Sequence, residues 1–232
     1  MTYRELQQKL RGLSDPEIAE HSLRFFKTGS GEYGRGDQFL GIRVPQVRKV
    51  AKEFKDMPLE DVQTLLRSEY HEERLCALIM LVNSFKSADR KQRSEIYSLY
   101  LDNTAYINNW DLVDVSAEHI VGAYLLDKDS EILYSLAKSD NLWERRIAVI
   151  STFHFIRNNE FEDTLAIAEQ LLKDEHDLIH KAAGWMLREV GKRDTGKLES
   201  FLQKFGSRMP RTMLRYAIEK FPEGKRKKYL TM

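Results

Sequence analysis

The sequence predicts an all-α fold, a superhelical stack of antiparallel helix pairs arranged as a repeat solenoid. Apolar residues recur at helical spacing along almost the whole chain, and no segment alternates as a strand would. The turns between the periodic segments are short, which favours antiparallel neighbouring helices. One pattern also returns about every 35 residues, a period typical of stacked helix pairs that bury a continuous core.

The N-terminal region is predicted to hold two short helices and then a loop. The helices cover residues 2–12 and 16–27, the second with Asp15 as its N-cap and Pro16 in its first position. The glycine-rich loop at residues 28–38 contains a G-x-G-x-x-G pattern. In a dinucleotide-binding fold this pattern follows a strand and opens a helix. Because it follows a helical segment here, we expect a mobile loop that approaches other backbone closely, not a nucleotide site.

Amphipathic segments follow one another through the rest of the chain. We expect helices at 45–54, 59–67, 70–86, 90–101, 110–126, 130–138, 141–157, 160–172, 176–191, 195–205 and 211–221, and a basic C-terminal tail at 222–232. Four of the segments place a basic residue just before a small or apolar face, with separations of 72, 35 and 34 residues: Arg74, Arg146, Lys181 and Arg215. Seventy-two is twice 36, so this spacing predicts one helix pair per repeat and a single repeat domain over residues 1–232.

Composition narrows the class of protein. The only cysteine, Cys76, lies in an apolar helical run, so we expect a small core residue and no disulfide within the chain. No apolar run approaches the length of a membrane span and the N-terminus lacks a signal-peptide pattern, which predicts a cytoplasmic protein. The net charge is only +1, yet residues 188–232 carry 13 Lys or Arg against 5 Asp or Glu. This segment is either a phosphate-binding face or a solvated basic helix end with a Lys-rich tail.

The candidate site starts from Trp110, at the predicted beginning of a helix and one turn before Asp114. In the repeat register, Arg146 and Trp185 fall on later helix pairs, so a concave stack would bring the four side chains together. Two indole faces, a carboxylate and a guanidinium suit a cationic planar ligand beside a phosphate. Each residue alone also has a structural interpretation: Trp185 in the core, Asp114 as a helix N-terminal charge, Arg146 at the surface.

Five blocks of the sequence together resemble the DNA alkylation repair family, the AlkD-like DNA glycosylases built from HEAT-like helical repeats. The blocks are FLGIRVPQVRKV, NNWDLVD, SDNLWERRIAV, AAGWMLRE and PRTMLRYAIEKF, in this order between about Phe39 and Phe221. The resemblance implies excision of positively charged N-alkylated purines, such as N3-methyladenine and N7-methylguanine, from duplex DNA by hydrolysis of the N-glycosidic bond. It also implies a monomer that needs no cofactor and associates with the nucleoid when bound to DNA.

Carried over by motif, the resemblance assigns the catalytic site to Trp110, Asp114, Trp185 and Arg146, with Asp111 as an intervening acid. We expect contacts to DNA from seven basic residues: Arg43, Arg48, Arg145, Lys181, Arg188, Arg211 and Arg215. No metal site is expected, since the i, i+4 pair His176 and His180 has no third ligand nearby.

The sequence departs from the family in two places. Phe25 stands where the family has an early tyrosine, and the loop at 28–38 is longer than in its best-known members. Two other interpretations stay open: a catalytically inactive HEAT-like repeat protein that binds DNA structure, and a scaffold that binds a protein partner.

Overall fold

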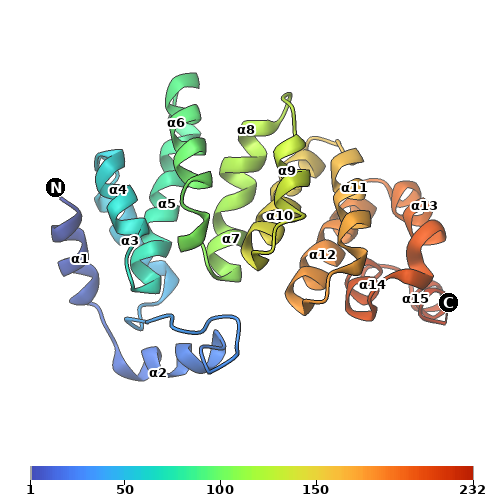
Figure 1. The fold of residues 1–232 in the computed structure, drawn as a ribbon, viewed down its shortest axis with the longest axis horizontal. Helices are drawn as coiled ribbons and strands as arrows, with labels where there is room; N and C mark the ends of the chain where they lie inside the picture. Colours follow the sequence, from blue (N-terminus) through green and yellow to red (C-terminus); the bar gives the residue numbers. More distant parts are fainter. Residues whose placement is uncertain (1, 232) are drawn as a thin grey trace. The chain divides into compact units, whose positions relative to one another are not determined.

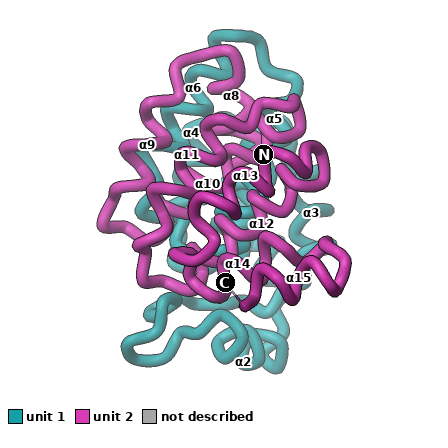
Figure 2. Tube along the Cα trace, turned by 90° about the vertical axis from the view of Figure 1, so that its right-hand side faces the viewer, with its two compact units in different colours: residues 1–116 teal, residues 117–232 magenta. Residues whose placement is uncertain are grey.

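The computed structural model describes residues 2–231, which form helices joined mostly by short connections, with a longer one at residues 26–43 (Figure 1). No strand occurs within this range, where Gln38 and Tyr70 form an isolated β-bridge. The prediction of an all-α fold of paired helices is confirmed. The chain divides into two compact units, Met1–Ser116 and Ala117–Met232, which Figure 2 colours separately.

The first unit is built around α5 (His71–Ser87), which packs against both α3 and α4. Apolar residues cover every side of α5, and the whole run from Leu75 to Val82 is buried, as expected of a helix surrounded by others. The other elements of this unit are α1 (Tyr3–Arg11), α2 (Pro16–Phe25), α3 (Val44–Glu53), α4 (Leu59–Leu66), α6 (Arg90–Leu101), a 3₁₀ turn (Thr104–Tyr106) and α7 (Trp110–Ala117), whose last residue falls in the second unit.

A buried carboxylate fixes the segment that follows the glycine-rich loop. Glu72 is 4% exposed, and its two oxygens accept the backbone N–H groups of Leu40, Gly41 and Ile42 at 2.9, 2.8 and 3.1 Å. Hydrogen bonds to an ionised acceptor are among the stronger ones in proteins. They satisfy three backbone donors in a segment without a strand partner, and thus hold it to the start of α5.

In the second unit α10 (Leu142–Arg157) and α12 (Asp177–Arg193) pack against each other, and α12 packs against α14 (Arg211–Ala217). The remaining elements are a π-helical turn (Glu118–Gly122), α8 (Ala123–Leu125), α9 (Glu131–Leu136), α11 (Glu162–Gln170), a 3₁₀ turn (Leu171–Lys173), α13 (Thr195–Phe205), a second 3₁₀ turn (Gly206–Arg208) and α15 (Glu223–Leu230).

Two predicted segments differ from the structure in their form. The helix expected at 110–126 contains the π-helical turn, and a Cβ on Gly122 in that turn would collide with the carbonyl oxygen of Ser151 on α10. The segment expected as a tail at 222–232 instead forms α15. Pro222 precedes its first turn, and the buried Tyr229 packs on Phe221 with ring centroids 5.9 Å apart, so one aromatic side chain anchors this basic helix.

Prediction and structure agree on the core position of Cys76. Its side chain is fully buried in α5, and burial raises the pKa of the thiol to about 12.

A hydrogen-bonded corner precedes α5. Ser68 Oγ donates to Glu73 at 2.6 Å and accepts the backbone N–H of Tyr70 at 3.1 Å. Arg74 donates from one Nη to the carbonyls of Ser68 and Glu69 at 2.9 and 3.0 Å. One arginine thus closes the turn in which the chain enters the helix.

The same corner precedes α10, with the same spacing. Ser139 Oγ donates to Glu144 at 2.5 Å and accepts the backbone N–H of Asn141 at 3.0 Å. Arg145 donates to the carbonyls of Ser139 and Asp140 at 2.9 and 3.0 Å. The turns before α5 and α10 therefore have the same hydrogen bonds at the same spacing, as expected of equivalent helices in a repeat protein.

This correspondence corrects the predicted repeat register by one residue. Arg74 matches Arg145, not Arg146, because Arg74 and Arg145 each close the turn five and six residues before them. Adjacent arginines on one helix face different sides, so sequence spacing alone did not distinguish the two.

Candidate functional site

The first half of the predicted site lies in the opening turns of α7. Asn109 is buried, and its side-chain oxygen accepts the backbone N–H of Trp110 at 2.9 Å. Leu112 and Val113 are also buried and hold the helix to the core. Trp110 and Asp114 are half-buried, so both side chains reach the surface. They lie one turn apart and therefore on the same side of the helix.

The negative charge of Asp114 affects the pKa of Tyr100. Burial raises the pKa of Tyr100 and the charge of Asp114 adds to this effect, although a hydrogen bond with Ser116 opposes it. The Tyr100 hydroxyl lies 3.0 Å from the Ser116 hydroxyl, and both side chains are fully buried. The Tyr100–Ser116 pair is thus a buried polar pair close enough to Asp114 for its charge to act on the Tyr100 hydroxyl.

Aromatic rings surround the Trp110 indole. Phe26 stacks on it with centroids 5.6 Å apart and an interplanar angle of 26°. Phe25, the last residue of α2, approaches edge-on at 6.0 Å and is 55% exposed. Phe25 therefore extends the aromatic surface of Trp110 toward solvent, at the position where the resemblance predicted the loss of a hydroxyl.

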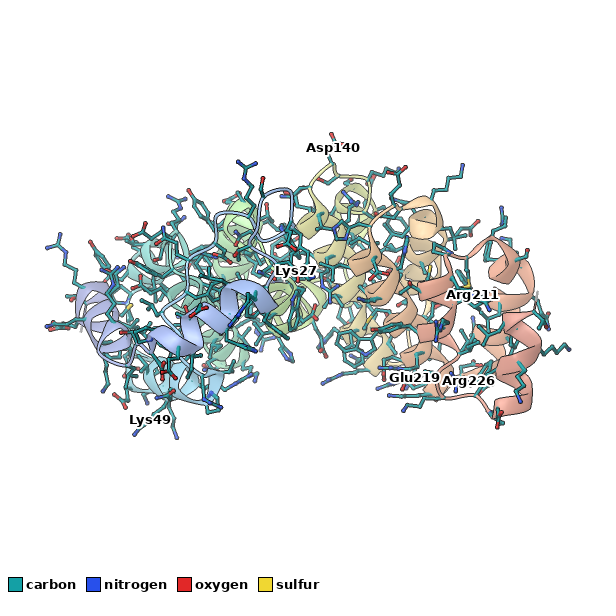
Figure 3. The ribbon with its side chains drawn as sticks, turned by 90° about the horizontal axis from the view of Figure 1, so that it is seen from below. Lys27, Lys49, Asp140, Arg211, Glu219 and Arg226 are labelled. Carbon is teal, nitrogen blue, oxygen red and sulfur yellow. The ribbon has the colours of Figure 1, made fainter. Side chains whose placement is uncertain are left out.

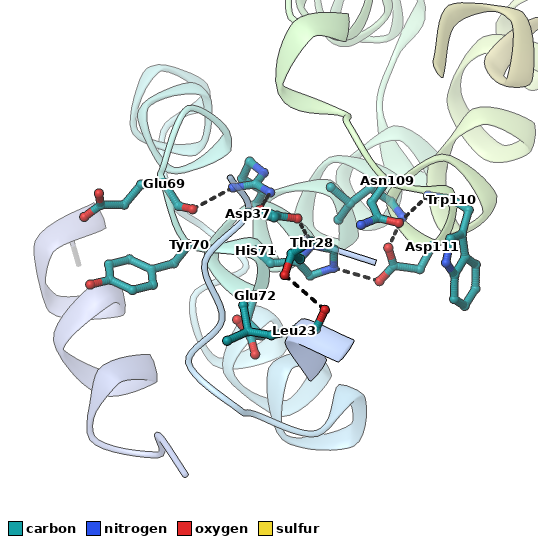
Figure 4. A network of polar contacts seen from close by, with 12 residues as sticks. Leu23, Thr28, Asp37, Glu69, Tyr70, His71, Glu72, Asn109, Trp110 and Asp111 are labelled. Carbon is teal, nitrogen blue, oxygen red and sulfur yellow. Dashed lines mark hydrogen bonds and ion pairs between the residues drawn. The ribbon is translucent and has the colours of Figure 1, made fainter. Parts of the chain in front are cut away.

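Next to these rings lies a chain of charges that is buried except at Asp111, which is half-buried (Figure 4). His71 places Nδ1 2.9 Å from Asp37 and Nε2 2.8 Å from Asp111, and Arg74 forms an ion pair with the other oxygen of Asp37. Burial alone would raise the pKa of Asp37, but hydrogen bonds and charge from His71 and Arg74 lower it. The four side chains come from the glycine-rich loop, α5 and α7.

The second half of the predicted site lies in the other unit. Arg146 on α10 is 5% exposed and donates to the carbonyl of Leu178, at the start of α12, at 2.7 Å. Trp185 on α12 is half-buried and meets Phe153 of α10 edge-on at 5.7 Å. Arg146 and Trp185 thus lie on two helices that pack together. The convergence of all four predicted catalytic residues at one site stays a prediction.

Residues 6–221 match the sequence model of a protein family described as DNA alkylation repair enzyme. The chain belongs to this family. It is similar in fold to a protein described as a predicted DNA alkylation repair enzyme from Enterococcus faecalis, with a TM-score of 0.73 and 17% identity over 90% of this chain and 97% of that one. A structure from Streptococcus mutans UA159 gives a TM-score of 0.50 and 17% identity over 99% of this chain and 97% of the other. No curated protein matches the sequence.

The seven basic residues expected to contact DNA fall into two groups in this member of the DNA alkylation repair enzyme family. The first group has exposed side chains: Arg43, Arg48, Arg211 and Arg215. Arg211, labelled in Figure 3, also donates to the carbonyl of Leu230 at 2.7 Å, which ties α14 to α15.

The second group forms ion pairs within the protein. Arg145 lies 2.6 Å from Asp174, and Lys181 lies 2.7 Å from Asp177. Arg188 pairs with Glu219 and contacts Glu189 at 3.5 Å. A side chain that already has a carboxylate partner must share or lose it to bind a phosphate, so this group is less available than the first.

The charged network below Trp110 was missed by sequence reasoning. Asp37 and Asp111 lie 34 and 40 residues from His71, and no spacing rule links such separations. The one signal was the position of Asp37 at the end of a glycine-rich loop followed by a buried segment.

Neither a metal site nor a membrane span is found in the described part of the chain. Residues 2–231 hold no group of three or more His, Cys, Asp or Glu side chains that could bind a metal ion. No helix in this range is both long enough and apolar enough to cross a membrane.

Proposed function

We propose that the protein is a DNA glycosylase that excises positively charged N-alkylated purines, N3-methyladenine and N7-methylguanine, from duplex DNA. The observation that carries the proposal is the pairing of Trp110 with Asp114 on one accessible side of α7, in a member of the DNA alkylation repair enzyme family. An indole face and a carboxylate, one helical turn apart, match the charge that such a nucleotide carries before and during cleavage.

The substrate needs little chemical activation. An N-alkylated purine carries a positive charge, so cleavage of the bond from C1′ to the base nitrogen returns the electron pair to that nitrogen and releases a neutral base. The sugar meanwhile develops oxocarbenium character. Catalysis therefore requires that a cation be held and that positive charge at C1′ be stabilised, which a preorganised carboxylate does.

Asp114 is proposed to act on a water molecule as well as on the sugar. The water oxygen forms a bond to C1′ as the bond to the base breaks, and Asp114 accepts the proton that the water loses. The products are an abasic site and the free alkylpurine. Trp110 and Trp185 would hold the purine cation through their ring faces, an interaction of about 0.5–2 kcal/mol each. Arg146 would contact the DNA backbone beside the lesion.

Binding of the duplex is proposed to rest on basic side chains at the surface. The exposed arginines Arg43, Arg48, Arg211 and Arg215 are the first candidates, with Arg145, Lys181 and Arg188 contributing where phosphates replace their carboxylate partners. Affinity that comes from phosphate contacts falls steeply with salt, because counterions are released on binding.

The test is base release from a duplex oligonucleotide that carries one N7-methylguanine. We expect release by the wild type, and a rate at least about a hundredfold lower for Asp114→Asn, the size of a lost general base. Affinity for the duplex should stay within about twofold. Asp56→Asn is the matched control, because Asp56 is an exposed carboxylate in the turn between α3 and α4.

Each outcome separates the candidate functions. Full turnover by Asp114→Asn would remove this carboxylate from the reaction. If the wild type releases neither N7-methylguanine nor N3-methyladenine but binds DNA in a salt-sensitive way, the protein is a non-catalytic DNA binder. If it also shows no salt-sensitive binding, the scaffold interpretation is the better one.

A further inference from the structure

His71 is a buried ionisable residue that the proposed reaction does not use. Its side chain is 2% exposed, yet both ring nitrogens lie within hydrogen-bond distance of carboxylate oxygens, at 2.9 Å from Asp37 and 2.8 Å from Asp111. Two phenyl rings that stack on each other also contact the imidazole: Phe26 and Phe39, with centroids 5.0 and 4.6 Å from that of His71. A histidine in this position is shielded from water and held by a carboxylate at each ring nitrogen.

Contacts with a carboxylate at each ring nitrogen favour a protonated ring. An ionised carboxylate only accepts hydrogen bonds, so both Nδ1 and Nε2 must donate, and the ring is an imidazolium. Burial would lower the pKa of His71, but the charge of Asp111 and the hydrogen bonds that the ring donates to Asp111 and Asp37 outweigh it and raise the pKa to about 9. With Arg74 on the far side of Asp37, the buried chain contains two positive and two negative charges.

The network joins three segments that sequence alone leaves unconnected. Asp37 lies near the end of the glycine-rich loop, His71 is the first residue of α5, and Asp111 lies in the first turn of α7 (Figure 4). Asp111 is the covalent neighbour of Trp110. Phe26, which covers His71, also stacks on the Trp110 indole, so His71 is connected to Trp110 by two routes.

We propose that His71 is a positioning residue: held between Asp37 and Asp111, it fixes the first turn of α7 and thereby the orientation of Trp110. Its importance for base excision rests on the proposed function, whereas its effect on Trp110 does not. Asp37 from the loop and Asp111 from α7 contact the ring directly, and Arg74 from α5 acts through Asp37.

The first measurement is NMR of the full-length protein without DNA. The chain has three tryptophans, so the indole N–H signal of Trp110 is assigned by its loss in Trp110→Phe. We expect this signal to shift with pH, with a midpoint near 9, in the wild type. The titration should be absent in His71→Gln, whose Trp110 signal should be displaced at pH 7.5. His154→Gln is the control, because His154 is a half-buried histidine on α10 in the other unit.

The second measurement is the single-turnover rate of N7-methylguanine release. His71→Gln should lower this rate about tenfold or more while affinity for undamaged duplex changes less than twofold. If His71 had a purely structural role, His71→Gln would reduce the amount of folded protein but not the release rate per folded molecule. If the wild type releases no base, the proposed function fails, and the Trp110 titration still tests the positioning role.

Asp111→Asn gives an independent route if His71→Gln does not fold. It leaves the contact between His71 and Asp37 in place and weakens only the end next to Trp110. We expect a displaced Trp110 signal, and a double variant no worse in release rate than the more affected single variant, because both changes break one contact. The proposal would be overturned if the Trp110 signal did not shift with pH up to 10 and had the same position in the wild type, in His71→Gln and in Asp111→Asn.

Discussion

The phenyl ring of Phe26 lies almost parallel to the indole of Trp110, with centroids 5.6 Å apart and an interplanar angle of 26°. Phe26 follows α2 directly and Trp110 opens α7, so this contact ties the N-terminal part of the first unit to the helix of the candidate site. Offset aromatic pairs contribute roughly 0.5–1.5 kcal/mol beyond the area they bury. The support of Trp110 thus depends on a residue 84 positions earlier in the chain.

Phe26→Leu should therefore destabilise the protein more than Phe25→Leu. The first substitution removes ring contacts with Trp110, His71 and Phe39, and we expect a loss of about 1–2 kcal/mol in unfolding free energy. Phe25 is 55% exposed, so its replacement should cost less than about 0.5 kcal/mol. Urea denaturation followed by circular dichroism measures both, and equal losses would contradict the assigned support.

Glu72→Gln should be costly although it changes a single atom. The carboxylate accepts three buried backbone N–H groups with two oxygens, and an amide offers only one acceptor. We expect a loss of about 2 kcal/mol in unfolding free energy, within the range for hydrogen bonds to charged groups. Glu69→Gln is the control, because Glu69 is exposed. A change below about 0.5 kcal/mol for Glu72→Gln would show that the loop segment is held by other contacts.

Gly184→Ala should separate α12 from α14. A Cβ at Gly184 would lie 2.5 Å from the carbonyl oxygen of Met213 and 2.6 Å from Cβ of Tyr216, so the helices must move apart. Overpacking of this kind costs about 1–3 kcal/mol. At Gly206, in the same unit, a Cβ would meet nothing within 4 Å. Gly206→Ala should be neutral or slightly stabilising, and thermal unfolding of the two variants tests the contrast.

The sequence was sufficient to predict most helices because their cores are built from local apolar periodicity and recognisable caps. Asp15, for example, accepts the N–H groups of Glu17 and Ile18 as the predicted N-cap of α2. It was insufficient where distant contacts decide the structure. The helix α15 depends on Tyr229 packing on Phe221, and the π-helical turn depends on the close approach of Gly122 to α10.

The candidate site shows the same division. Trp110 and Asp114 could be placed on one side of a helix from their spacing alone. The network below them could not, because Asp37, His71 and Asp111 come from three separate segments. Arg145 and Arg146 were distinguishable only through their partners, Asp174 in one case and the carbonyl of Leu178 in the other.

Arg145→Ala and Arg48→Ala should therefore change different properties: the first the stability of the protein, the second its binding of DNA. Arg145 closes the turn before α10 and pairs with Asp174, so its loss should reduce stability by about 1–3 kcal/mol. Arg48 is exposed on α3, and its loss should leave stability nearly unchanged. If Arg48 binds a phosphate, the salt dependence of duplex affinity becomes shallower by about one unit in the log–log slope. Fluorescence anisotropy at several salt concentrations, with a parallel urea titration, distinguishes the two effects.

The stability of the protein should also depend on pH through His71. Its pKa is about 9 in the folded protein and near 6.5 when unfolded, so its contribution is complete below pH 6.5 and is lost as pH rises through 9. The contribution is on the order of 3 kcal/mol. Asp37 acts at the other end of the scale: its pKa is lowered by folding, so its contribution is lost in acid.

Denaturation midpoints between pH 6 and 10 check this dependence. The wild type should lose stability across the alkaline part of this range. His71→Gln should be less stable at pH 6, and its stability should change less with pH. Parallel curves for the two proteins would mean that another group dominates alkaline unfolding.

The charges of four side chains alternate in sign along the network: Arg74, Asp37, His71 and Asp111. This alternation determines the electrostatic potential that the network presents to an approaching polyanion. Two cations and two anions cancel, so their summed potential fades within a few ångströms, well inside the screening distance of about 8–10 Å in physiological salt. A phosphate chain that approaches Trp110 therefore meets no net repulsion from Asp37 and Asp111.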